Sequence, residues 1–140
     1  MSEFTFHEMF NLQEDEPEYR LVTTDHIGFS QVNGVGIITI EKEGLTLLAA
    51  EAFHDTAHFL RPRHLKQVAA ILHDKDASSN DHFVAWDLLK NANIAAGGIL
   101  PMCQDTGTAI ILGKKGQNVW TNCNDEAALS EGVEKAFIEG

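Results

Sequence analysis

The spacing of apolar residues along the chain changes at Gly44. Before this glycine, β-branched and aromatic residues recur in rough alternation, and the pair Asn33-Gly34 interrupts them, as such a pair does in tight β-hairpins. After it, apolar residues recur at steps of three and four, which is the period of a helix, until Pro62. The sequence therefore predicts a hairpin of strands at 27–32 and 35–41, followed by a helix from 45 to about 61.

Local start signals and periodicity predict the other elements. Pro62 suits the first turn of a second helix, and N-cap residues at 78–81 precede the apolar body of a third. The pattern at 19–24 allows a further strand. The remaining predictions are an end of the third helix near 92, a strand through 112, a hairpin partner for it at 118–121, and a last helix at 126–138. The expected fold class is α+β (mixed α/β), with a small sheet of hairpin strands packed against several helices in a single domain.

The chain divides into an acidic arm and one domain. Residues 1–18 are rich in Glu, Asp, Asn and Gln, a composition typical of a solvated N-terminal arm. The remaining residues, 19–140, have the length of a single domain and contain no internal repeat or linker.

Charge and apolar content argue against several functions. The net charge of −11 opposes long-range attraction to nucleic acid or to an anionic membrane, so neither is expected as a partner. No apolar run approaches the roughly 18 residues of a membrane span, and the first residues lack the basic start of a secretory signal. We therefore expect a cytoplasmic protein whose two cysteines, Cys103 and Cys123, are reduced thiols.

The segment from Gly97 to Gly113 carries several chemically versatile side chains in its centre. Pro101 removes a backbone donor and Gly107 permits dihedral angles closed to other residues, so the chain is expected to leave regular structure between them. The resulting turn would present a thiol, an amide and a carboxylate together, from Cys103, Gln104 and Asp105.

The residues alone leave three chemistries open for this turn. A thiolate nucleophile at Cys103 would need a base delivered by the fold, because no histidine lies near it in sequence. A structural zinc site would need a second cysteine two to four residues away, which is missing. An iron–sulfur cluster would need further thiolates, and Cys123 is the only other cysteine in the sequence.

A separate metal hypothesis concerns His54 and His58, which lie four residues apart on the predicted first helix. This spacing lets two imidazoles reach one zinc ion. The segment lacks the glutamate beside the first histidine that a zinc protease uses as a base, and no third ligand is evident. The plainer interpretation places both histidines on the solvent-exposed side of the helix.

Three stretches around the turn carry a long and specific pattern. They are Asn91-Ala92-Asn93-Ile94-Ala95-Ala96, Leu100-Pro101-Met102-Cys103-Gln104-Asp105-Thr106-Gly107-Thr108-Ala109-Ile110-Ile111 and Gly113-Lys114-Lys115-Gly116-Gln117. Together they closely resemble the N-terminal part of the class I, iron–sulfur-dependent fumarases. The similarity extends back through 45–49 and forward through 125–129, so it covers nearly all of the chain after about Tyr19. Tartrate dehydratase is a more distant relative with the same type of Cys-Gln-Asp-Thr-Gly loop.

The resemblance implies a 4Fe-4S cluster held by three cysteines, with one iron open to substrate, in a hydro-lyase that interconverts fumarate and L-malate. By this resemblance Cys103 is the first cluster ligand, and Gln104 and Asp105 bind the dicarboxylate substrate. The same resemblance gives Asp105 a catalytic part in proton transfer. It also implies that the parent enzyme is a homodimer.

The chain departs from this family in length. The other two cysteine ligands lie far beyond position 140, and Cys123 matches neither of them. The family's substrate-binding arginines and lysine are also missing, and Lys114 and Lys115 are the few cations near the turn. We therefore expect an N-terminal fragment that is inactive alone and has the remainder of the enzyme as its partner. The alternatives are a tartrate dehydratase-type hydro-lyase and a non-catalytic binding domain that keeps the fold.

Overall fold

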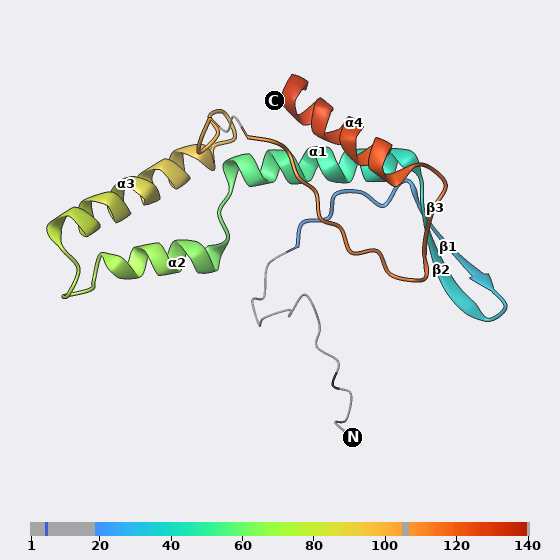
Figure 1. The fold of residues 1–140 in the computed structure, drawn as a ribbon, viewed down its shortest axis with the longest axis horizontal. Coiled ribbons are helices and arrows are strands. Elements are labelled where there is room, and N and C mark those ends of the chain that lie inside the picture. The colour runs from blue at the N-terminus through green and yellow to red at the C-terminus, as the bar shows by residue number, and fades with distance from the viewer. Residues whose placement is uncertain (1–4, 6–18, 105–106, 140) are drawn as a thin grey trace.

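The computed structural model describes residue 5, residues 19–104 and residues 107–139. The predicted acidic arm, 1–18, lies outside the described residues apart from that single position, and so do Asp105 and Thr106. In chain order the described elements are β1 (Ile27–Val32), β2 (Val35–Ile40), α1 (Lys42–His58), α2 (Pro62–Ile71), α3 (Ser79–Ala95), β3 (Val119–Thr121) and α4 (Asp125–Glu139), as Figure 1 shows.

Strands β1 and β2 form the predicted hairpin. They pair antiparallel up to the turn, where Val32 lies opposite Val35. The two turn residues, Asn33 and Gly34, have φ angles of 51° and 80°. A tight two-residue hairpin requires these left-handed values, and asparagine and glycine tolerate them best. This prediction is confirmed, and the signal that carried it lies wholly within the turn.

A third strand completes a mixed sheet with the order β1-β2-β3. Strand β3 lies parallel to β2, with Ile38 opposite Val119 and Ile40 opposite Thr121. The expected α+β fold class is confirmed, with one parallel pair in place of the second hairpin. This parallel pairing brings the start of α4 beside the start of α1 (Figure 1).

Two predicted strands do not form. Residues 19–24 lie in irregular structure before β1, and residues 109–112, expected to pair with β3, are also irregular. The edge of β2 that the hairpin leaves open is occupied by the β3 segment, where the Asn118 carbonyl accepts a 2.9 Å hydrogen bond from the Ile38 N–H. The predicted partner therefore pairs with β2, and the apolar run does not extend the sheet on the other side of β3; Leu112 at its end is 85% exposed. Alternation of residue types does not by itself provide a partner edge.

Helix α1 begins and ends three residues earlier than predicted. Gly44 lies inside its first turn and is buried, and a Cβ at this position would lie 3.2 Å from the Ile40 side chain. The helix ends early because Phe59 is extended, with φ −123° and ψ 135°, which leads the chain to Pro62 at the start of α2. Helices α2, α3 and α4 form close to their predicted positions.

Helices α1 and α4 pack closely through small residues. Ala128 is 0% exposed and Ala49 is 3% exposed. The Thr46 hydroxyl donates a 3.1 Å hydrogen bond to the Ala128 carbonyl on the facing helix. A Cβ at Gly132 would lie 2.7 Å from the Cβ of Ala49, which is far inside ordinary contact. The absence of a side chain at Gly132 therefore permits this approach of the two backbones.

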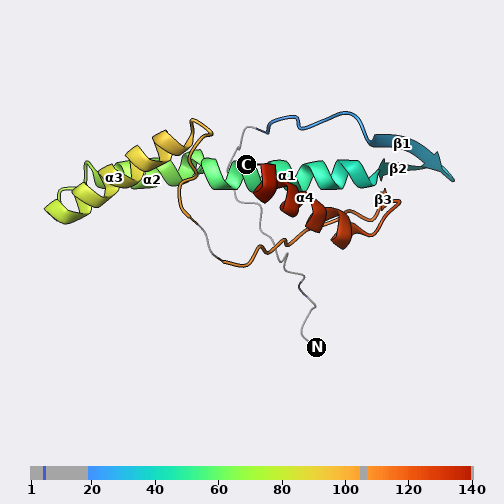
Figure 2. The ribbon, with the colours of Figure 1, turned by 90° about the horizontal axis from the view of Figure 1, so that it is seen from above.

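Helices α2 and α3 form a helical pair at the other end of the molecule (Figures 1 and 2). Helix α3 begins with a capping box. The Ser78 hydroxyl accepts a 3.2 Å hydrogen bond from the Asp81 N–H, and the Asp81 carboxylate accepts a 2.9 Å bond from the Ser78 N–H. The Ser78 hydroxyl also donates a 2.7 Å hydrogen bond to the Asp81 carboxylate, and this bond, together with that from the Ser78 N–H, lowers the pKa of the Asp81 carboxyl.

Replacing Ser78 by alanine is expected to lower the free energy of unfolding by about 1 kcal/mol. The substitution removes the oxygen that accepts the Asp81 N–H at the start of α3. Urea unfolding followed by circular dichroism measures this loss. The matched control is Ser79→Ala, because the Ser79 side chain makes no hydrogen bond among the described residues. Equal losses in the two variants would show that the cap does not stabilise α3.

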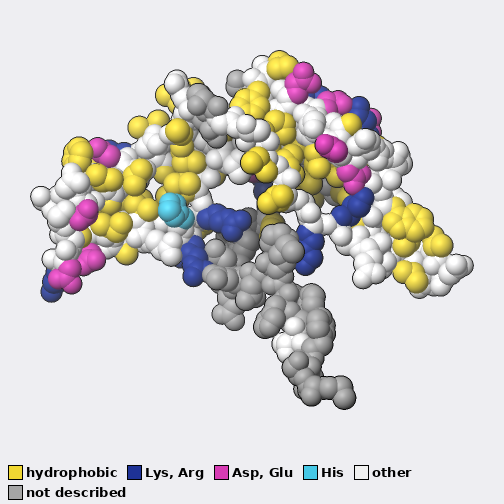
Figure 3. Space-filling model, viewed as in Figure 1, with side chains coloured by type: hydrophobic (Ala, Val, Ile, Leu, Met, Phe, Trp, Pro, Cys, Tyr) yellow, Lys and Arg dark blue, Asp and Glu magenta, His cyan; other side chains and the backbone are white. Residues whose placement is uncertain are grey.

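The described residues leave much apolar surface exposed. No large side chain among them is fully buried, whereas Tyr19 is 89% exposed and Phe29 is 72% exposed. Figure 3 shows apolar side chains at the surface of the α2–α3 pair and of the hairpin. The accessible surface is 11838 Å², a total that also counts the residues outside the described ranges; a compact monomer of this mass has about 7200 Å². No described helix is both long and apolar enough to cross a bilayer.

Candidate functional site

The chain leaves α3 through Gly97 and Gly98 and crosses to the C-terminal end of α1. Gly98 has a φ of 71°, a left-handed conformation typical of glycine at a helix end. The backbone of Met102 then contacts both helices. Its N–H donates a 2.9 Å hydrogen bond to the Ala57 carbonyl of α1, and its carbonyl accepts a 2.8 Å bond from the Asn91 side-chain amide of α3. We call these three residues the Met102 clamp.

The Ala57 contact satisfies a carbonyl that α1 cannot pair internally. The last four carbonyls of a helix have no partner within it. The Phe59 N–H donates to the Asp55 carbonyl at 2.8 Å, and the Met102 N–H supplies a donor for Ala57. The turn before Cys103 is therefore anchored by capping the end of α1.

Cys103 and Gln104 follow the clamp directly. Both residues are exposed, and Cys103 is a free thiol. Asp105, the predicted catalytic residue, lies outside the described residues, so its placement beside them stays a prediction. The structure thus brings the predicted thiol and amide together at the surface near the end of α1.

Cys123 lies at the opposite end of α1. Thr121 pairs with Ile40 just before that helix begins, whereas Met102 is bonded to Ala57 in its last turn. About 22 Å of helix separates these two ends. Cys123 is also a free thiol. The two cysteines therefore lie too far apart to share a disulfide or one iron–sulfur cluster.

Asn91 and Ala57 are site residues that sequence reasoning missed. Asn91 lies within a stretch that carries the family resemblance, yet its partner, Met102, is 11 positions further along the chain. Ala57 contributes only a backbone carbonyl, so its residue type carries no signal. The sequence signal that could have indicated the Ala57 contact is Pro62. A helix that ends before a proline leaves its last carbonyls without partners, and these need hydrogen-bond donors from another segment.

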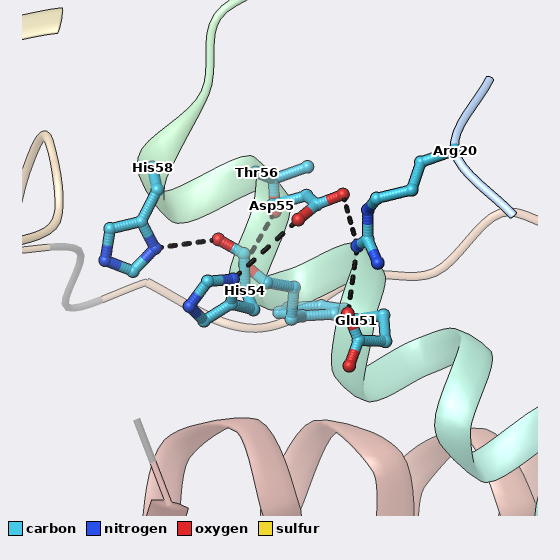
Figure 4. A network of polar contacts seen from close by, with 7 residues as sticks. Arg20, Glu51, His54, Asp55, Thr56 and His58 are labelled. Carbon is cyan, nitrogen blue, oxygen red and sulfur yellow. Dashed lines mark hydrogen bonds and ion pairs between the residues drawn. The ribbon is translucent and has the colours of Figure 1, made fainter. Parts of the chain in front are cut away.

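Figure 4 shows His54 and His58 on α1, where the two rings stack with centroids 4.5 Å apart. The Nδ1 atom of His58 lies 2.9 Å from the His54 carbonyl oxygen. Because a carbonyl only accepts, this nitrogen carries a proton. His58 is 8% exposed. The interpretation that both histidines face solvent is therefore right for His54 and wrong for His58.

The histidine pair has no third zinc ligand in the described part of the chain. There, the group of three side chains with potential ligand atoms within 4.8 Å of one another consists of His26, Glu41 and Glu43. All three are exposed, and they lie near the start of α1, away from the histidine pair. Zinc binding at His54 and His58 therefore finds no support in the described geometry.

Arg20 joins the segment before β1 to α1 beside the histidine pair (Figure 4). Its Nη2 atom lies 2.9 Å from a carboxylate oxygen of Asp55 and 2.9 Å from one of Glu51. The hydrogen bond to Asp55, together with that to Glu51, raises the pKa of Arg20 further above its usual range. This guanidinium is thus engaged in ion pairs within the fold.

Lys115, one of the few cations near the turn in sequence, is engaged at the start of α4. Its Nζ lies 2.5 Å from the Asp125 carboxylate and 3.1 Å from the Thr121 hydroxyl. The hydrogen bond from Lys115 lowers the pKa of the Asp125 carboxyl. Because Asp125 lies at the end of α1 opposite Cys103, Lys115 does not supply positive charge to the turn.

The chain is expected to lose stability in acid through the carboxylates of α4. Lys115 lowers the pKa of Asp125, and Lys42 lowers that of Glu131. A group whose pKa is lower in the folded state contributes stability above its unfolded pKa and loses it as the pH falls through its folded pKa. The urea midpoint should therefore drop as the pH falls from about 5 to about 3. The drop should be smaller in an Asp125→Asn, Glu131→Gln double variant, and an equal drop would show that other groups cause it.

Comparison with known proteins places the chain in a family. The family model described as fumarate hydratase (Fumerase) matches residues 46–140, a stretch that includes the Met102 clamp, Cys103 and α4. The chain therefore belongs to the fumarate hydratase family, as the resemblance predicted.

Within the family the chain corresponds to the N-terminal region of the class I enzymes. The anaerobic class I fumarate hydratase of Escherichia coli is 54% identical over 136 residues, which is 97% of this chain and 25% of the relative. The aerobic class I enzyme of Salmonella typhimurium is 52% identical over 97% of this chain and 23% of the relative. The mitochondrial fumarate hydratase 1 of Leishmania major is 45% identical over 141 residues, which is 98% of this chain and 26% of the relative. The chain thus spans about a quarter of the length of these curated relatives.

Proposed function

We propose that this chain is the N-terminal part of a class I fumarate hydratase and that Cys103 is one of three thiolate ligands of a 4Fe-4S cluster. The observation that carries the proposal is the geometry of the turn. The backbone of Met102 is bonded to two helices, and the exposed thiol of Cys103 follows immediately. A cluster ligand needs this combination of access and fixed position.

The residues of the chain fit such a cluster in kind and provide one ligand. Cysteine thiolates hold iron–sulfur clusters, and Cys103 is a thiol outside any disulfide. Because Cys123 lies about 22 Å of helix away, two further thiolates belong to the rest of the polypeptide, which makes up about three quarters of the relatives. When bound, a cluster with an open iron supplies a Lewis acid that polarises a carboxylate or hydroxyl group of the substrate.

The proposal gives the residues of the turn separate tasks. Gln104 is exposed beside the thiol, and its amide donates hydrogen bonds to a carboxylate of fumarate or L-malate without adding charge. Asp105 hydrogen-bonds the substrate and takes part in moving the proton. Neither residue is cationic, and Lys115 is engaged with Asp125. The cations that hold the dicarboxylate therefore belong to the remaining part of the enzyme.

The exposed apolar side chains support the remainder of the enzyme as the partner of this chain. Monomeric proteins rarely leave large contiguous apolar patches uncovered. We assign this surface to contact with the remaining three quarters of the polypeptide. The whole enzyme, rather than this chain alone, is the unit that we propose to form a homodimer in the cytoplasm. The side chains concerned are each 52–85% exposed and include Phe29, Phe83, Trp86, Ile94, Leu112 and Phe137.

The test restores the missing part. This chain is joined to the remaining three quarters of the anaerobic class I enzyme of Escherichia coli, to give what we call the joined protein. The joined protein and the chain alone are reconstituted anaerobically with iron and sulfide and assayed for hydration of fumarate. We expect turnover by the joined protein and none by the chain alone. Turnover by the chain alone, or none by the joined protein when the E. coli enzyme is active after the same treatment, would contradict the proposal.

The same assay distinguishes the alternative functions. We expect the joined protein to turn over fumarate and L-malate in preference to tartrate. Faster turnover of tartrate would favour a tartrate dehydratase-type hydro-lyase. Failure with all three substrates, together with a full cluster, would favour a binding domain that has kept the fold without the chemistry.

A further inference from the structure

We propose that Asn91 is a positioning residue for the Cys103 thiol and that it acts through the Met102 carbonyl. The Asn91 Nδ2 atom lies 2.8 Å from that carbonyl oxygen. The inference rests on the proposed function in one respect, namely that the positioned thiol is a cluster ligand.

The two hydrogen bonds of the clamp fix successive peptide planes. The Met102 N–H belongs to the peptide that joins it to Pro101, and Ala57 holds this plane from α1. The Met102 carbonyl belongs to the peptide that joins it to Cys103, and Asn91 holds this plane from α3. Because a peptide unit is planar and includes the Cα of the next residue, the second plane fixes the Cα of Cys103. Only the rotations about N–Cα and Cα–Cβ then separate the fixed plane from the sulfur.

Without Asn91 the second plane would lose its anchor. Ala57 would still hold the Met102 N–H, but the torsion about the Met102 Cα–C bond would be free to turn the next peptide. Cys103 would then sample a range of positions. The hydrogen bond from the Asn91 amide therefore fixes the position of the Cys103 backbone, and with it the region that the thiol can reach.

The surroundings of Asn91 suit this task. It stands in the last part of α3, where Ala92 is 8% exposed and Ala95 is 1% exposed, so the helix backbone that carries it is packed. The next asparagine, Asn93, is exposed, and its side chain makes no hydrogen bond among the described residues. The two asparagines share a helix and a residue type but differ in their contact with the turn, which makes Asn93 a matched control.

Two variants of Asn91 test the positioning role in this chain. Asn91→Ala removes the donor, and Asn91→Asp keeps the shape but replaces the donor with an acceptor that faces the Met102 carbonyl. Each is expected to speed hydrogen exchange of the Met102 amide by about fivefold, because the Ala57 hydrogen bond that protects this amide then holds the turn without the support of the Asn91 contact. Asn93→Ala should leave this exchange unchanged. If exchange is equal in all variants, and circular dichroism shows the same helix content in each, the Asn91 hydrogen bond does not hold the turn and the inference is wrong.

The link to the cluster is tested in the joined protein by the iron bound per chain after reconstitution, alongside the absorbance of the cluster. Asn91→Ala and Asn91→Asp are expected to lower the bound iron at least about twofold, as loss of a contact that orients a metal ligand does. Asn93→Ala should bind as much iron as the parent. Faster exchange with undiminished iron would overturn the positioning of a ligand by Asn91.

A Cys103→Ser variant separates this inference from the proposed function. If Cys103→Ser binds the full amount of iron, the ligand assignment in the proposed function fails, and with it the ligand part of the inference. The exchange measurement judges the Met102 contact independently, because it needs no metal. If Cys103→Ser loses iron and the Asn91 variants do not, the proposed function stands and the inference falls.

Discussion

Replacing Cys103 by serine is expected to abolish the cluster of the joined protein and to lower its rate of fumarate hydration by more than about a hundredfold. Serine has a hydroxyl of similar size, but iron–sulfur clusters are held by thiolates. The exposed position of Cys103 means that the substitution removes a ligand without opening a hole in the core. Iron content, sulfide content and turnover measured on one preparation quantify the effect.

Cys123→Ser is the control for this prediction. Cys123 lies at the other end of α1, and its side chain is partly exposed. Its replacement should leave the iron content and turnover of the joined protein close to those of the parent. Equal loss of iron in the two serine variants would show that a general defect in folding, rather than a missing ligand, causes the loss.

Gly132→Ala is expected to lower the free energy of unfolding by about 1–3 kcal/mol. A Cβ at Gly132 would lie 2.7 Å from the Cβ of Ala49 and even closer to the carbonyl oxygen of Thr46. The Thr46 oxygen is a backbone atom, and the Ala49 Cβ cannot rotate away from the new methyl group. Helices α1 and α4 must therefore move apart. The gain of about 1 kcal/mol in helix propensity opposes this cost but does not remove the clash. Urea unfolding of the chain measures the difference.

The control for the helix contact is Gly113→Ala, because a Cβ at Gly113 would meet open space. This variant should unfold within about 0.5 kcal/mol of the parent. If Gly132→Ala is as stable as the parent or more stable, the close approach of α1 and α4 is wrong.

Elements with local signals were the ones that the sequence predicted well. The hairpin turn depends on Asn33 and Gly34, both of which have positive φ. The start of α3 depends on a capping box between Ser78 and Asp81, which lie only three positions apart. The strands that failed, at 19–24 and 109–112, have the right composition but do not pair with any described strand. Strand pairing is decided by segments distant in sequence, as the parallel contact of Ile38 with Val119 shows.

The turn around Cys103 was predictable, but the contacts that hold it were not. Pro101 and the flanking glycines marked an irregular segment, and the structure agrees that Cys103 and Gln104 are exposed there. The anchor depends on an Asn91 side chain and an Ala57 carbonyl that belong to two separate helices. The burial of His58 was also missed.

The measurement that tests the central claim most directly is the reactivity of the Cys103 thiol in the joined protein. Alkylation by iodoacetamide is followed by peptide mass spectrometry before and after anaerobic reconstitution with iron and sulfide, with Cys123 as the internal control. If Cys103 ligates the cluster, reconstitution should slow its alkylation by at least about tenfold, because the thiolate is then bound to metal, and should leave Cys123 unchanged. Alkylation of Cys103 at the same rate in a preparation that contains the full cluster would contradict the account.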